Sequence, residues 1–131
     1  DVDDHFGWSV SLSYSGDVLA VGSPHNEDGG YVQIFKYNQE NKEWDRQGQQ
    51  IDGEQAGDRF GYSVAFSKDA STVVIGAPGS ESLGAKSGRA AVYHWKNNAW
   101  QQLGNHIFGT AWDQFGYKVA ISEGANRITV G

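Results

Sequence analysis

Three kinds of side chain in this sequence could take part in chemistry: carboxylates, histidines and aromatic rings. Carboxylate and amide oxygens gather in Asn26, Glu27 and Asp28, just before a glycine pair. Such oxygens are the ligands that Ca²⁺ requires, but a polar surface turn has the same composition. We keep these three residues as candidate metal ligands, and expect a turn without a bound metal or cofactor.

The histidines and serines do not form a catalytic pattern. His5, His25, His94 and His106 show no motif spacing with a nucleophile or with a second metal ligand. No serine lies in the strained turn motif that hydrolases use. We therefore predict no catalytic residue and a protein that is not an enzyme.

The elements that position these side chains follow from an internal repeat. The pairs Phe6-Gly7, Phe60-Gly61 and Phe115-Gly116 recur at intervals of 54 and 55 residues. A second landmark follows each pair at a fixed offset, as residues 21–24, 75–78 and 130–131, and Trp44 and Trp100 mark a third. Self-similarity with one period is the signature of a repeat fold.

Each repeat has the periodicity of short strands. Large side chains at 60, 62, 64 and 66 alternate with small ones, and the apolar runs 18–21, 73–75 and 128–130 suit a strand buried on both faces. Four strands in about 54 residues make one blade of a β-propeller. We predict an all-β propeller of four-stranded antiparallel blades at 1–57 and 58–112, with the first two strands of a third at 113–131, ten strands in all.

The Phe-Gly pairs followed by Ile75-Gly76-Ala77-Pro78, and by the similar Val21-Gly22-Ser23-Pro24, resemble the FG-GAP repeat of the integrin α-subunit propeller. The resemblance implies an extracellular or surface protein that binds other macromolecules. Many repeats of that family carry a calcium loop between the first two strands. Here the turns 13–17, 67–71 and 122–126 each hold at most one carboxylate, so the family's calcium ligands are not carried over.

Several residues are expected to serve the fold. Asp4, Asp58 and Asp113, each two residues before Phe-Gly, are predicted to accept backbone N–H bonds in the links between blades. The repeated aromatic residues are predicted to pack between blades; they are Trp8, Tyr62 and Tyr117 at one position and Trp44 and Trp100 at another. Trp112 has no counterpart in the earlier repeat, so both an exposed contact and local packing remain open for it.

Composition limits the partners. The net charge of −6 and the scattered positions of the 10 lysines and arginines argue against a nucleic acid partner, and we expect none. No apolar run is long enough to cross a bilayer, and we expect no direct membrane insertion. The sequence has no cysteine and no methionine, and from the missing methionine we expect a fragment of a longer or processed chain.

These observations predict a non-catalytic, extracellular or cell-surface scaffold for adhesion or for binding proteins or glycans. The alternatives are a structural subunit of a filament or large surface assembly and, third, a propeller enzyme. Expected partners also include the remaining blades of a longer chain, or self-association. The candidate contact residues lie in the variable loops and beside them: His25, Asn26, Glu27, Asp28, Glu81, Ser82, Lys86 and Trp112.

Overall fold

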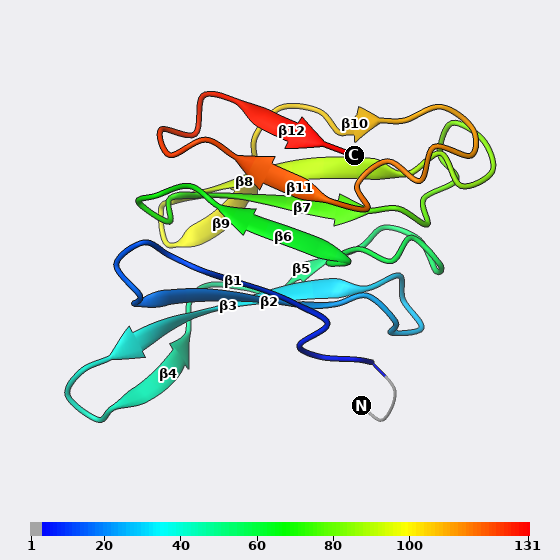
Figure 1. The fold of residues 1–131 in the computed structure, drawn as a ribbon. Coiled ribbons are helices and arrows are strands. Elements are labelled where there is room, and N and C mark those ends of the chain that lie inside the picture. Colours follow the sequence, from blue (N-terminus) through cyan, green and yellow to red (C-terminus); the bar gives the residue numbers. More distant parts are fainter. Residues whose placement is uncertain (1–3) are drawn as a thin grey trace.

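The computed structural model describes residues 4–131 as three antiparallel sheets stacked one above another (Figure 1). It confirms the predicted all-β class and the blade architecture. The first three residues of the predicted first blade lie outside the described residues. Within residues 4–131, no helix is long and apolar enough to cross a membrane.

The three sheets follow the three repeats. The first consists of β1 (Ser9–Leu12), β2 (Val18–Ser23), β3 (Tyr31–Asn38), β4 (Glu43–Arg46) and β5 (Ile51–Asp52). The second consists of β6 (Ser63–Phe66), β7 (Thr72–Ala77), β8 (Arg89–Lys96), β9 (Ala99–Gln102) and β10 (Ile107–Phe108). The third pairs β11 (Val119–Ile121) with β12 (Ile128–Val130). Strands β1, β6 and β11 lie next to one another along one edge of the stack (Figure 1).

The fourth strand of each complete blade is split in two, so the described residues hold twelve strands where the sequence predicted ten. Both β4 and β5 pair with β3, and both β9 and β10 pair with β8. Between β4 and β5, Gly48 has a φ of +80° and turns the chain out of the sheet. The indole Nε1 of Trp100 in the next blade donates to the Gln47 carbonyl at 3.0 Å. The residues that interrupt the fourth strand of the first blade therefore hydrogen-bond to the second blade.

Small residues at the repeated landmarks allow the blades to approach closely. Ser9 Oγ donates to the Gly61 carbonyl oxygen at 2.7 Å, and Ser63 Oγ donates to that of Gly116 at 2.8 Å. A Cβ atom on Gly76 would overlap the same Gly116 oxygen. The glycine landmarks of the sequence are thus the contact points between neighbouring sheets.

Large residues at the other landmarks fill the space between blades. Phe60 is 1% exposed and Trp100 is 2% exposed, because the first blade covers both side chains. The equivalent residues of the first blade are 52% exposed at Phe6 and 40% exposed at Trp44. Trp100 therefore packs between two blades, whereas the same prediction for Trp44 is not tested, because no described blade precedes the first.

Trp8, Tyr62 and Tyr117 contact one another between blades, but they lie at the surface and not in the core. Their rings form a row across the three blades, with centroids 5.3 Å apart for Trp8 and Tyr62 and 4.8 Å apart for Tyr62 and Tyr117. Trp8 and Tyr117 are about half exposed. The strands that carry them form the edge of the stack, so one side of each ring meets solvent.

Candidate ligand-binding face

The connections at one end of the sheets form a surface that we call the loop face, made of residues 24–30, 53–62, 78–88 and 109–117 (right side of Figure 1). These segments are the β2–β3 and β7–β8 loops and the links between blades. They differ in sequence from one blade to the next. Variable loops on a rigid scaffold are where binding residues concentrate.

The residue before each Phe-Gly pair has the same unusual backbone conformation. The φ angles are +52° at His5, +58° at Arg59 and +51° at Gln114, in the left-handed region that few non-glycine residues adopt. A backbone bond closes each bend, such as Tyr62 N–H to the Arg59 carbonyl at 3.1 Å. The repeat thus places one variable side chain per blade at the loop face.

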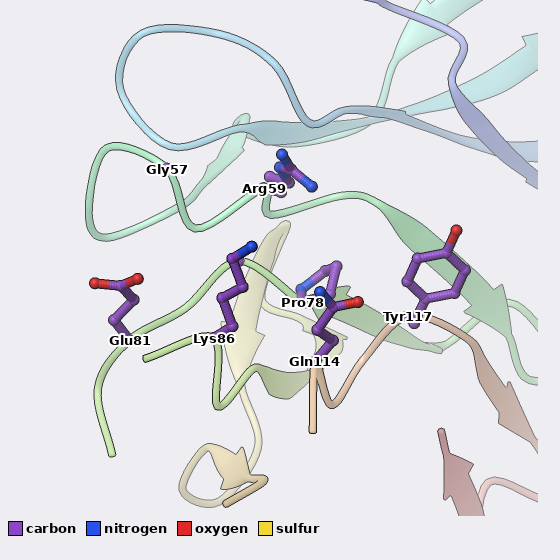
Figure 2. Close-up of a pocket in the computed structure, with 8 residues that line it drawn as sticks. Gly57, Arg59, Pro78, Glu81, Lys86, Gln114 and Tyr117 are labelled. Carbon is purple, nitrogen blue, oxygen red and sulfur yellow. The ribbon is translucent and has the colours of Figure 1, made fainter. Parts of the chain in front are cut away.

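A pocket of ≈ 150 Å³ opens on the loop face. Segments from the links between blades and the β7–β8 loop line it, with the residues Gly57, Arg59, Pro78, Gly79, Glu81, Lys86, Gln114 and Tyr117. Figure 2 shows the head groups of Arg59 and Lys86 on the same side of the pocket, with Glu81 and Tyr117 at opposite ends. Polar side chains of several loops therefore converge on one space.

Buried hydroxyl groups hold the base of the β7–β8 loop. Ser87 Oγ donates to the Ser80 carbonyl at 3.1 Å, and the Gly88 N–H donates to the same oxygen at 2.9 Å. Both serines are buried, whereas Glu81 and Lys86 are exposed. The loop has a fixed base and presents its charged residues to solvent.

The link to the third blade lies against this loop. Trp112 N–H donates to the Ala85 carbonyl at 2.8 Å, and Gln114 N–H donates to the Lys86 carbonyl at 2.9 Å. The Trp112 side chain is 70% exposed, and Lys86 Nζ lies 6.0 Å from its ring centroid. Trp112 is therefore an exposed aromatic residue beside the pocket.

A groove of ≈ 500 Å³ continues from the pocket, because Tyr117 lines both. It runs along the exposed edge of β1, β6 and β11. Its lining contains the aromatic row described above and one lysine, and the full set is Trp8, Ser9, Val10, Tyr62, Ser63, Val64, Tyr117, Lys118 and Val119. No residue in this lining is acidic.

A histidine pair occupies the corresponding region of the first blade. The rings of His5 and His25 meet edge to face with centroids 4.6 Å apart, and Trp8 lies 5.2 Å from His25. Burial, followed by the charges of His5 and Arg59, lowers the pKa of His25. His25 is therefore neutral near pH 7.

The candidate metal ligands form a hydrogen-bonded turn. Asn26 Oδ1 accepts the Gly30 N–H at 2.6 Å, and Glu27 and Asp28 are exposed. Among residues 4–131, no group of three or more histidine or acidic side chains is arranged to hold a metal ion. Between the first two strands of each repeat, serine hydroxyls satisfy the turn. For example, Ser67 Oγ donates to Asp69 Oδ1 at 2.8 Å.

A buried charge cluster lies where the second blade meets the first. The Arg89 guanidinium is buried, donates to Asp58 Oδ2 at 2.8 Å and also pairs with Glu54. Its Nη1 lies 3.0 Å from His106 Nδ1, which must accept this bond because arginine only donates. Burial and the Arg89 charge lower the pKa of His106. His106 is therefore neutral, with its proton on Nε2.

The aspartates before Phe-Gly bond the backbone of the links between blades. Asp58 Oδ2 accepts the Gln55 N–H at 3.3 Å, and Asp113 Oδ2 accepts the Thr110 N–H at 2.7 Å. At Asp4 the carbonyl accepts from Ser23 Oγ at 2.5 Å. Asp58 differs from Asp113 in also neutralising a buried arginine.

The stacked four-stranded blades with a loop face define a β-propeller module. The FG-GAP repeat family matches residues 1–35 and 52–93, more than half of the sequence, so the chain belongs to this family. No curated protein matches the chain.

Solved structures match the fold. One is the crystal structure of a putative 6-phosphogluconolactonase from Bacteroides uniformis, with a TM-score of 0.58 and 14% identity. The match covers 96% of this chain and 33% of that protein, so the chain spans about a third of its length. At this identity the likeness concerns the fold alone.

The structure brings together some of the predicted contact residues. Glu81 and Lys86 line the pocket, and Trp112 lies beside it, whereas His25 to Asp28 lie on the first blade and Ser82 bonds Ser80 within its own loop. Arg59, Gln114 and Tyr117 also line the pocket but were not among the predicted contact residues. Their signal was the position next to the Phe-Gly landmark, which was interpreted only as part of the repeat.

Proposed function

We propose that this protein is a non-catalytic binding scaffold whose loop face binds other proteins or glycans outside the cell or at its surface. The observation that carries the proposal is the pocket of Figure 2, where loops from neighbouring blades converge with side chains that the repeats do not share. A rigid stack that displays variable loops suits recognition. FG-GAP repeats are typically found in extracellular or surface proteins, which supports the location and a role in adhesion.

The proposed scaffold works without catalysis and without a cofactor. The pocket lining includes one carboxylate, Glu81, and no histidine. Acid–base chemistry commonly needs a second positioned group. The lactonase named above is therefore a weak guide to activity. If the chain hydrolysed a sugar lactone faster than buffer does, and the Glu81→Gln variant lost that rate, the protein would be an enzyme.

The exposed side of the first blade favours a second candidate, a structural subunit of a filament or large assembly. Phe6 and Trp44, whose equivalents in the second blade are buried, are exposed there together with Leu12 of β1. Such a patch is typical of a protein contact. Its partner would be further blades of a longer chain or a second copy.

The test is direct binding of the full chain to an array of extracellular proteins and glycans. We expect at least one ligand to bind the wild type and to lose about tenfold or more in affinity to the Lys86→Asn/Gln114→Ala variant. The matched control is Lys42→Asn/Gln39→Ala, which removes the same side chains from the β3–β4 turn at the opposite end of the stack. Circular dichroism would verify that both variants fold.

Equal loss in the two variants would contradict a specific role of the loop face. If both variants retained binding, the binding site would lie elsewhere on the molecule. If no ligand bound and the chain formed ordered assemblies, the structural-subunit candidate would replace the binding scaffold.

A further inference from the structure

The pocket of the loop face contains two positive charges, those of Arg59 and Lys86. Within residues 4–131, neither Arg59 nor Lys86 has an ion pair. In the described part of the chain, Lys68 pairs with Glu123 at 3.0 Å and Arg89 pairs with Asp58 at 2.8 Å, while most other lysines and arginines are unpaired. Arg59 and Lys86 differ from those in lining the same pocket. The sequence has 16 acidic residues against 10 basic ones, so two unpaired cations in one pocket depart from the surrounding charge.

The positive character extends beyond the pocket. The adjoining groove contributes Lys118 and no carboxylate, and Glu81 is the one acidic residue among both linings. Arg59 also lowers the pKa of His25, after burial and His5, so its field reaches the first blade. On a chain of net charge −6, this continuous surface is suited to an anion.

Aromatic rings flank the two cations. Trp112 has a φ of +72°, a costly conformation for a bulky residue, yet its ring is 70% exposed. At the other end of the pocket, Tyr117 begins the row of rings that continues along the groove. Exposed rings offer flat apolar surfaces with little conformational freedom to lose, and these suit the faces of sugar rings.

We propose that this site binds an anionic oligosaccharide, with a carboxylate or sulfate between Arg59 and Lys86 and sugar rings against Trp112 and Tyr117. The proposal rests on the proposed binding function and names the ligand class. Arg59 supplies a planar fork that pairs with two oxygens, and Lys86 supplies a point charge. The groove accepts the next units of the polymer. The exposed rings favour a glycan over an acidic peptide.

The experiment is titration calorimetry of the full chain with four probes of similar length: tetragalacturonate, a carrageenan tetrasaccharide that carries sulfate and no carboxylate, neutral maltotetraose and an oligoglutamate peptide. We expect one of the two acidic glycans to bind at least about tenfold more tightly than the neutral one. Its affinity should fall as salt rises, because exposed charges are screened. Comparing the first two probes separates carboxylate from sulfate.

Three variants locate the site. Arg59→Gln places at this position the residue that Gln114 already supplies in the next blade with the same backbone. Lys86→Asn and Trp112→Asn use a residue that tolerates positive φ. We expect about tenfold weaker binding of the acidic glycan for each variant. Lys96→Asn, an exposed lysine at the far end of β8, should bind as the wild type does.

The inference is overturned if maltotetraose binds as well as the acidic glycans, if oligoglutamate binds more tightly, or if Lys96→Asn weakens binding as much as Lys86→Asn. In those cases the binding scaffold is still tested separately, by the array of extracellular proteins and glycans described under the proposed function. A protein or neutral glycan bound through the loop face would preserve the scaffold and remove only the anionic ligand. No ligand in either experiment would remove both.

Discussion

Arg89 shows how a single side chain can tie two blades together. It is buried on the second blade, while its partners Asp58 and Glu54 lie in the link between blades. The position equivalent to Arg89 in the first blade is Tyr31, so the charge is not a requirement of the repeat. A buried pair contributes little against a well-packed apolar substitute, but it is costly to break on one side.

We predict that Asp58→Ala lowers the free energy of unfolding by about 3 kcal/mol, because it removes the buried partner of Arg89 and leaves that charge with the exposed Glu54 carboxylate alone. Adding Arg89→Met to Asp58→Ala should recover most of the loss. Glu54→Gln, which changes the exposed partner, should cost less than about 1 kcal/mol. Urea unfolding measures all three, and equal costs for Asp58→Ala and Glu54→Gln would refute this role.

At the scale of the strands, close packing depends on the glycine just before the last residue of the second strand, Gly22 in β2 and Gly76 in β7. Gly76 lies against the carbonyl oxygen of Gly116 and beside Ser63 Oγ. No side chain fits there, which explains why the Gly-Ala-Pro landmark has a glycine at this position. The second strand of a blade therefore carries the glycine that lets the next blade approach closely.

Gly76→Ala should destabilise the joint between the second and third blades by about 2 kcal/mol or more, because the new methyl group meets backbone atoms. The expected signal is faster amide hydrogen exchange in β11 and β12 with smaller changes in β1 and β2. Gly124→Ala is the matched control, since nothing lies within 4 Å of a Cβ built there. Similar exchange rates in both variants would show that the contact of Gly76 with Gly116 does not determine the stability of this joint.

The sequence predicted these strands well because alternation and landmarks are local. Residues 73–75, for instance, lie within a strand that is buried along its whole length. It did not predict the split fourth strand, because the cause is a contact of Gln47 with Trp100 in another blade. The pocket was missed for the same reason, since Arg59 and Lys86 line one pocket only when the links fold back onto the β7–β8 loop. The repeated rings of Trp8 and Tyr117 looked like core because their exposure depends on their place at the edge of the stack.

The whole molecule has uncovered ends. Phe6 and Trp44 are exposed on the first blade, although their equivalents Phe60 and Trp100 are buried by a neighbour. The joint between the first two blades shows what would cover them, namely a sheet with glycines opposite Phe6 and a carbonyl opposite the Trp44 indole. The stack therefore presents a surface shaped for another blade.

We predict that the full chain self-associates in solution, and that Phe6→Ser/Trp44→Gln reduces this association with little change in the unfolding temperature. Light scattering over a concentration series, with a thermal unfolding curve, measures both. Tyr14→Ser/Lys42→Gln, at exposed turn positions, is the control. A monomeric wild type with cooperative unfolding would show that the chain is stable with its ends open.

The left-handed bend before each Phe-Gly pair has a consequence for how such a protein can change over generations. Three unrelated residues, His5, Arg59 and Gln114, share one backbone shape, and that shape is maintained by main-chain bonds. A duplicated blade would inherit the stacking intact while this one position remained free to diverge. Selection can therefore alter what the surface recognises without a loss of folding stability. For the same reason, a designer could randomise the three codons at these positions.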